Sequence, residues 1–331
     1  MILHPAVLAL FISSLLIGFM VLYAALHAAR IVRWWDSRSG SELQLRLERD
    51  TYLVSTLLAY AFGFQLLSFF LYIFTADTLH SLFVGAMCAA GTLQVNGYGY
   101  PALVLKLTNF LLAGLWLIMN YTDNRAYDYP LIRKKYVFLL ALVPFIVTEM
   151  AVQGLYLSGL RADIITSCCG SLFSADNNGV TSDLAALPAL PLEIAFYASM
   201  GATLLLGLWF IRKGRGGYLF SLSAGTAFFV AIASLISFIS LYFYEMPSHH
   251  CPFDILQKEY GFIGYPLYLA LLAGGVAGMG VGVIMPFRKR ESLREVVPQL
   301  QKRLAAATVA LYFLFTAIVT YRMVFSDFTM R

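Results

Sequence analysis

The chain has 331 residues, of which 60% are hydrophobic and only 12% are Asp, Glu, Lys or Arg. Soluble domains carry about 25% charged residues, so this composition argues against a soluble globular enzyme. Four cysteines in so long a chain exclude a small disulfide-built scaffold, and a net charge of +5 does not by itself indicate nucleic-acid binding, because basic residues also set membrane orientation.

Eight apolar segments are each long enough to cross a bilayer as a helix. A hydrocarbon core of about 30 Å needs roughly 20 helical residues at about 1.5 Å each. The first segment is followed by its basic residues and shows no cleavage site, so we interpret it as a retained span instead of a signal peptide. We predict an all-α membrane protein, forming a single domain over 1–331, with spans at 5–29, 51–74, 101–121, 137–157, 191–211, 217–245, 262–286 and 304–323.

Basic residues concentrate in every second connection between these segments. The connections at 30–50, 122–136, 212–216 and 287–303 hold 18 of the 23 Lys and Arg residues. The positive-inside rule places these four loops in the cytoplasm. We therefore expect a multi-pass protein of a bacterial inner membrane with both termini on the periplasmic side.

Two of the cytoplasmic connections have a mixed pattern of charged and apolar residues. The stretches 41–50 and 291–303 place Leu or Val among charges at helical spacing. This pattern is compatible with short helices on the membrane surface and equally with ordinary solvated connectors.

A short motif occurs twice at the outer ends of the spans. Cys88 and Cys251 each begin the pattern C-x4-L-Q-x(5–7)-Y-P, after an outward-running helix and before an inward-running one. The recurrence predicts a parallel four-plus-four duplication with pseudo-repeats at about 1–160 and 161–331. A chance match of a few residues is the alternative.

All four cysteines lie on the predicted outer side. An oxidising periplasm permits disulfides, and the adjacent residues Cys168 and Cys169 would be strained if bonded to each other. We expect them to reach separately to Cys88 and Cys251. In that interpretation the two disulfides are structural links between the fourth outer segment and the two motifs.

A metal site is the alternative use of the same face. Thiolate, thioether and imidazole groups together suit copper, and thiolate with imidazole also suits zinc. A b-type haem is disfavoured, because no pair of facing histidines lies within the spans. The candidate ligands besides the cysteines are His80, His249, His250, Met87 and Met246.

The segment 251–258, CPFDILQK, resembles the C-P-x-C-x-L-Q-R element of quinone-coupled membrane oxidoreductases that generate periplasmic disulfides. In that family the motif opens an inward-running helix, and a second cysteine pair lies in another outer loop, as Cys168 and Cys169 do here. Asp254 and Gly91 stand where the family has its second motif cysteine. A C-x-x-C pair cannot form in either copy, so the catalytic activity of the family does not carry over.

One pair of opposite charges lies inside the predicted membrane region. Lys106 in the third span and Glu149 in the fourth lie at matching depths below the outer boundary, with Asn109 and Gln153 one turn away on the same faces. A charge in hydrocarbon costs at least about 2.5–3.5 kcal/mol, so such residues pair or line a functional cavity. Lys106 and Glu149 are therefore candidates for a structural ion pair or for a proton or quinone-headgroup site.

Small residues in the seventh span predict close helix packing. Gly274, Gly278 and Gly282 form a G-x-x-x-G-x-x-x-G ridge, and the sixth span is its expected neighbour because it carries Ser221, Ser223 and Gly225.

Three functions fit these observations. We favour a membrane subunit of a redox system that handles thiols, a metal or a quinol at the outer face, because sulfur-bearing and ionisable groups gather there. A transporter and a scaffold subunit without chemistry are the alternatives; a transporter should also place polar groups near the midplane, which is nearly bare. Quinone and copper are the cofactors considered, and the expected partners are the bilayer and other membrane or periplasmic subunits, not nucleic acid.

Overall fold

The computed structural model describes residues 3–36, 39–161, 164–166, 187–247 and 249–328. Every regular element among these residues is a helix. Among the described residues, eight helices are long and apolar enough to cross a membrane, which confirms the predicted number of spans and the all-α fold. The chain groups into two compact units, which are described separately below.

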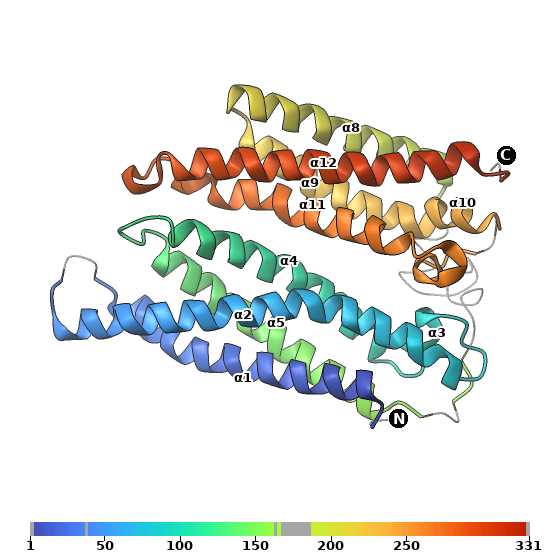
Figure 1. Ribbon diagram of the computed structural model, residues 1–331, viewed down its shortest axis with the longest axis horizontal. Coiled ribbons are helices and arrows are strands. Elements are labelled where there is room, and N and C mark those ends of the chain that lie inside the picture. Colours follow the sequence, from blue (N-terminus) through green and yellow to red (C-terminus); the bar gives the residue numbers. More distant parts are fainter. Residues whose placement is uncertain (1–2, 37–38, 162–163, 167–186, 248, 329–331) are drawn as a thin grey trace. The chain divides into compact units, whose positions relative to one another are not determined.

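The first unit contains four long helices that run alongside one another (Figure 1). Their side chains build one continuous apolar core, in which Phe62 packs edge-on against the buried ring of Trp116 at 5.0 Å. The Tyr136 hydroxyl donates to the Thr51 carbonyl and so joins two of the helices. The helices are α1 (Pro5–Trp34), α2 (Glu42–Leu79, with Ala76 onward in the second unit), α4 (Gly99–Asp123) and α5 (Ile132–Ser158).

The described part of the second unit contains four further spans. One of them is a composite of α9, a π-helical segment (Leu235–Ile239) and α10, which together cross as a single helix. Short segments at the helix ends complete the unit, among them α3 (Ala89–Leu93) and the 3-10 turn η3 (Asp254–Leu256). The long helices are α8 (Ala189–Lys213), α9 (Gly217–Ser234) with α10 (Ser240–Tyr244), α11 (Gly264–Ile284) and α12 (Val296–Phe325).

The glycine ridge of α11 packs closely against its neighbours, as predicted. A methyl group added at Gly278 would lie 2.5 Å from Cβ of Ala224 on α9. The same ridge also receives α12, because a methyl group at Gly274 would lie 2.6 Å from the ring of Tyr312. Thr308 of α12 donates to the Gly274 carbonyl at 3.1 Å, so hydrogen bonds join the helices where small residues permit close approach.

Most of each mixed stretch belongs to a span, while Glu291–Leu293 form a separate 3-10 turn, η6. Residues 42–50 form the first turns of α2 itself, and residues 296–303 form the first turns of α12. The apolar residues at helical spacing therefore extend the spans. Leu47 packs into the core of the first unit, and Val297 is fully buried.

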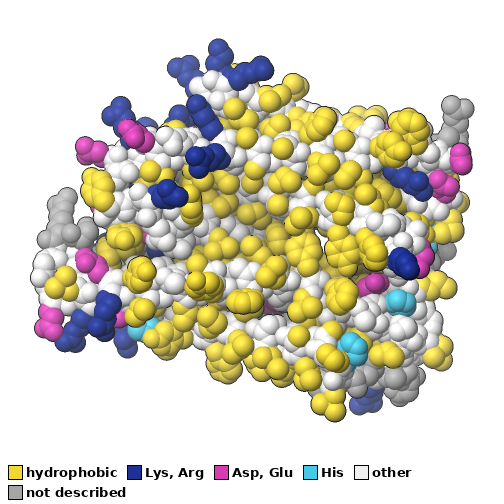
Figure 2. All heavy atoms as spheres, in the orientation of Figure 1, with side chains coloured by type: hydrophobic (Ala, Val, Ile, Leu, Met, Phe, Trp, Pro, Cys, Tyr) yellow, Lys and Arg dark blue, Asp and Glu magenta, His cyan; other side chains and the backbone are white. Residues whose placement is uncertain are grey.

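Large apolar side chains cover the outer flanks of the helices (Figure 2). Such a surface is unfavourable in water and favourable in lipid. The structure therefore fits a protein that spans the membrane several times. Exposed examples include Phe19, Leu26, Phe64, Leu205, Leu222 and Phe313.

Candidate functional site

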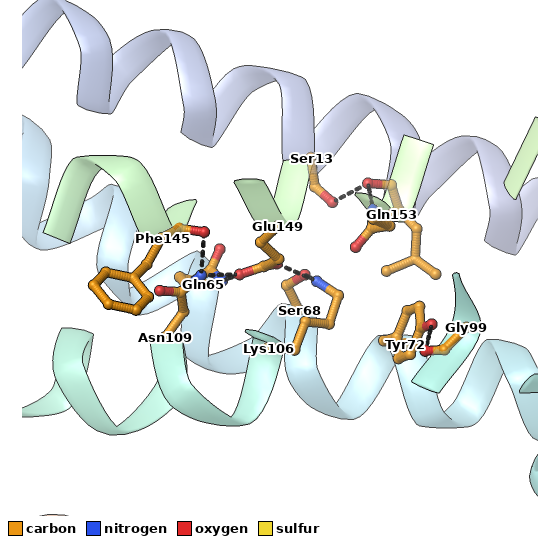
Figure 3. Close-up of polar contacts among 11 residues, drawn as sticks. Ser13, Gln65, Ser68, Tyr72, Gly99, Lys106, Asn109, Phe145, Glu149 and Gln153 are labelled. Carbon is orange, nitrogen blue, oxygen red and sulfur yellow. Dashed lines mark hydrogen bonds and ion pairs between the residues drawn. The ribbon is translucent and has the colours of Figure 1, made fainter. Parts of the chain in front are cut away.

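The predicted pair of charges in the membrane interior forms a buried cluster in the first unit (Figure 3). Lys106 Nζ lies 2.8 Å from Glu149 Oε1 and also donates to the Ser68 hydroxyl at 2.7 Å. The second carboxylate oxygen accepts hydrogen bonds from the amides of Gln65 and Asn109, each at 2.5 Å. Side-chain exposure is 1% for Lys106 and 3% for Glu149.

The contacts of this cluster balance its charge. One ammonium and one carboxylate sum to zero, and both carboxylate oxygens have strong donors from α2 and α4. Buried charges are tolerated when they are paired and fully hydrogen-bonded. The arrangement favours a structural pair that joins three helices. Gln153, expected on the same face as Glu149, donates instead to the Leu10 carbonyl of α1.

A second buried ion pair in the first unit escaped the sequence analysis. Lys135 Nζ lies 2.7 Å from Asp123 Oδ2 and donates to Asn120 Oδ1 at 3.0 Å, and both ionic side chains are fully buried. Asp123 Oδ1 accepts the backbone N–H of Leu131. The pair closes the connection between α4 and α5, where the sequence showed only a charged loop.

The second unit brings two cysteines together. Cys88 precedes α3 and Cys251 precedes η3, yet their Sγ atoms lie 3.4 Å apart, and both side chains are fully buried. The Cys251 thiol donates to Asp254 Oδ1, also at 3.4 Å. The other oxygen of Asp254 lies 2.5 Å from His249 Nε2. We call Cys88, Cys251, Asp254 and His249 the thiol cluster.

The charges of the thiol cluster stabilise one another. The hydrogen bond to Asp254 raises the pKa of His249 above its usual value, against the opposing effect of burial. Burial disfavours ionisation of Asp254, but hydrogen bonds from His249 and from the thiols outweigh it and lower the pKa of that carboxyl. A carboxylate is thereby held beside two thiols inside the protein.

Side chains around the thiol cluster fix the two loops that carry it. The Tyr244 hydroxyl donates to the Cys251 carbonyl at 2.6 Å and accepts the Ile255 N–H at 3.0 Å. Gln257, of the repeated L-Q pair, donates to the Met87 carbonyl at 3.0 Å and so connects the loop of Cys251 to that of Cys88. The Tyr268 hydroxyl donates to the Pro252 carbonyl.

The remaining predicted ligands make other contacts. A ring nitrogen of His80 contacts the Asp77 carbonyl oxygen, and Nδ1 of His250 lies 3.0 Å from the Ile236 carbonyl oxygen. The side chains of Met87 and Met246 are 64% and 44% exposed. Within the described part of the chain, the group of metal-ligating side chains that converges is Cys88, Cys251 and Asp254.

The predicted disulfides involve residues that the structure does not describe. Cys168 and Cys169 lie outside the described residues, so their pairing with Cys88 and Cys251 stays a prediction. The proximity of Cys88 to Cys251 was not foreseen from the sequence. Its only signal was that the two cysteines hold equivalent positions in the repeated motif.

The chain has no detectable match among the proteins with which it was compared. Searches of known protein families, curated proteins and solved structures each found none. The geometry of the chain itself and the local motif resemblance are therefore the basis for proposing a function.

Proposed function

We propose that the protein is a membrane-embedded subunit of a redox system and that Cys88 and Cys251 are its reactive thiols. The observation that carries the proposal is the approach of these two thiols to 3.4 Å beside a buried carboxylate. The resembling family uses two cysteines of one motif, and here each copy of the motif supplies one. Asp254, at the position of the missing cysteine, becomes the neighbouring base.

The reaction is the reversible conversion of the two thiols into a disulfide. Oxidation breaks two S–H bonds, forms one S–S bond, and releases two protons and two electrons. Asp254 accepts the hydrogen bond of the Cys251 thiol and is positioned to take its proton, while His249 stabilises the carboxylate from the other side. The proposed oxidant is a two-electron acceptor of the quinone class, which takes up both electrons and both protons.

A cavity near the thiol cluster has the properties that such an acceptor requires. It has a volume of about 740 Å³ and lies in the second unit, lined by Phe243, Tyr260, Ile263, Tyr321 and Arg322 among others. Apolar and aromatic walls with a few polar groups are typical of sites for small amphiphilic molecules. The Tyr260 ring packs 4.9 Å from the Tyr244 ring, and Tyr244 in turn packs against His249 at 4.6 Å.

The distribution of basic residues supports action at the periplasmic face of a bacterial inner membrane. Because 18 of the 23 Lys and Arg residues lie on alternate connections, the proposed orientation places both termini and the thiol cluster on the periplasmic side. A periplasm-active reporter fused after Arg331 should be active, and one inserted near Arg290 should be inactive. The reverse pattern at both positions would contradict this orientation.

The test of the redox proposal is a map of the disulfide after oxidation. The purified full-length protein is reduced, exposed to a soluble quinone, alkylated and digested for mass spectrometry. We expect a Cys88–Cys251 crosslink that appears on oxidation and disappears on reduction. Cys168→Ser combined with Cys169→Ser is the matched control and should retain the crosslink. Stable links from Cys88 or Cys251 to Cys168 or Cys169 would instead establish the structural disulfides.

A further inference from the structure

We propose that the reduced thiol cluster binds a divalent ion of the zinc class through Cys88, Cys251 and Asp254. The inference goes beyond the redox proposal and does not require it, because a metal can occupy the thiolates whether or not they are ever oxidised. One ligand atom from each of these three buried residues lies within 4.8 Å of the other two.

The spacing of the donor atoms is that of ligands around one ion. Tetrahedral zinc with bonds of about 2.3 Å to sulfur and about 2.1 Å to oxygen separates two sulfurs by about 3.8 Å and a sulfur from an oxygen by about 3.6 Å. The two thiols lie 3.4 Å apart, and Cys251 lies 3.4 Å from Asp254 Oδ1. Each distance needs an expansion of only a few tenths of an ångström. A disulfide needs a sulfur separation of about 2.05 Å, and hence a larger movement in the opposite direction.

The chemistry of the donors selects the ion. Thiolates alone suit copper(I) as well as zinc, but a carboxylate oxygen is a hard donor that copper(I) disfavours. Zinc accepts thiolate, imidazole and carboxylate ligands together. The predicted copper ligands Met87 and Met246 are exposed. Among the described residues, the ligand that lies beside the two thiols is a carboxylate and not a thioether.

Burial provides a second reason for a cation at this place. Cys88 and Cys251 are fully buried, and Asp254 is 7% exposed. In a medium of low dielectric, the attraction between these donor atoms and a divalent ion is stronger than it is in water.

His249 has the position of a residue that orients a metal ligand. Its Nε2 contacts the outer oxygen of Asp254 at 2.5 Å, so that the inner oxygen points toward the thiols. Its ring packs edge-on against Tyr244, which also holds the Cys251 carbonyl. Loss of such a partner typically lowers metal affinity by roughly 10- to 100-fold. The described residues supply three ligands, which leaves the fourth tetrahedral position to a ligand that is not among them.

Cobalt(II) is a suitable probe because its absorption reports thiolate coordination and tetrahedral geometry. The reduced full-length protein in detergent is titrated with cobalt(II) under anaerobic conditions and then with zinc(II). We expect one cobalt ion per chain, a thiolate charge-transfer band, and complete displacement by zinc. Cys88→Ser and Cys251→Ser should each abolish the band, and Asp254→Asn should weaken binding at least 10-fold.

Two further variants separate the proposed site from its surroundings. His249→Gln should retain the thiolate band but weaken binding about 10-fold or more, as expected for a positioning residue. Cys168→Ser combined with Cys169→Ser, and His80→Gln, are controls that should bind cobalt as the unmodified protein does. Size-exclusion profiles and thermal melts establish that each variant is folded.

Three results would overturn the proposal. They are an absence of cobalt and zinc binding to the folded, reduced protein, a thiolate band that survives the loss of Cys88, and a band that is lost in the Cys168 and Cys169 control. Failure here leaves the redox proposal intact, because the disulfide map is recorded without metal. Conversely, a metal site with no reversible crosslink would remove the redox proposal alone.

Discussion

The Lys106–Glu149 cluster and the thiol cluster are both buried polar groups, but they differ in how their atoms are satisfied. Both oxygens of Glu149 accept hydrogen bonds from nitrogen donors at 2.5–2.8 Å, and the ionic pair is neutral. In the thiol cluster the carboxylate is held between His249 at 2.5 Å and the weak thiol donors, of which Cys251 lies at 3.4 Å.

Under the proposed function, the difference separates a structural role from a reactive one. A neutral ion pair whose carboxylate oxygens both accept hydrogen bonds gains nothing from a change in protonation, so it fixes the positions of helices. Two thiols beside a carboxylate can lose protons, form a bond or bind a metal without large rearrangement. Buried charge alone is therefore a poor marker of chemistry in this protein, and the state of the hydrogen-bond partners distinguishes the two sites.

The largest expected effect on stability comes from breaking the Lys106–Glu149 ion pair. Glu149→Gln leaves the Lys106 ammonium without its counterion, and breaking a buried pair costs about 3–5 kcal/mol. The double variant Lys106→Met with Glu149→Gln should recover much of that loss, because neither charge remains. Unfolding of the detergent-solubilised protein, followed by circular dichroism, measures both effects.

The double variant also tests the comparison between the two clusters. A structural pair predicts that it forms the Cys88–Cys251 crosslink at the unmodified rate once stability is regained. A stable double variant that has lost this reaction would show that Lys106 and Glu149 take part in proton or quinone chemistry. Simple additivity of the two single changes would mean that the residues do not interact in the folded protein.

A somewhat smaller loss is expected at the second buried pair. Asp123→Asn leaves Lys135 buried without a counterion, but the Asn120 oxygen still accepts one of its hydrogen bonds, so we expect destabilisation of about 3 kcal/mol. Glu42→Gln is the matched control, since its pair with Arg46 is 71–79% exposed and should contribute less than about 0.5 kcal/mol. Equal effects of the two changes in the same unfolding measurement would contradict the role given to burial.

The smallest effect is predicted for the glycine ridge. Gly278→Ala places a methyl group 2.5 Å from Cβ of Ala224 and should destabilise the second unit by about 1–3 kcal/mol through overpacking. Gly63→Ala in α2 is the control, because its added methyl group meets no atom within 4 Å, and helix propensity predicts a gain of up to about 1 kcal/mol. Thermal melts of both variants measure these changes in stability. If Gly278→Ala leaves the stability unchanged, α9 and α11 can separate enough to admit the methyl group.

The eight spans and the Lys106–Glu149 pair could be predicted from the sequence. Both depend on the length of apolar segments or on the position of a residue along one segment, and neither requires knowledge of tertiary contacts. The length of an apolar segment determines whether it can cross a bilayer, and no tertiary contact is needed to count it. The pairing of Lys106 with Glu149 was predicted from their depths in the membrane. Because spans cross the same bilayer, two residues at the same depth can meet if their helices are neighbours. The glycine ridge was found for a similar reason, because its spacing lies within one helix.

Tertiary structure alone decided the rest. Asp123 and Lys135 lie at the ends of their helices, where the sequence cannot distinguish a buried charge from the solvated charges of a basic loop. Cys88 and Cys251 lie 163 positions apart in loops, and their approach depends on the folding of two chain segments that carry no periodic signal. Neither membrane depth nor helical spacing constrains a loop, so the assembly of the thiol cluster, with Asp254 in contact with a cysteine, became apparent only in three dimensions.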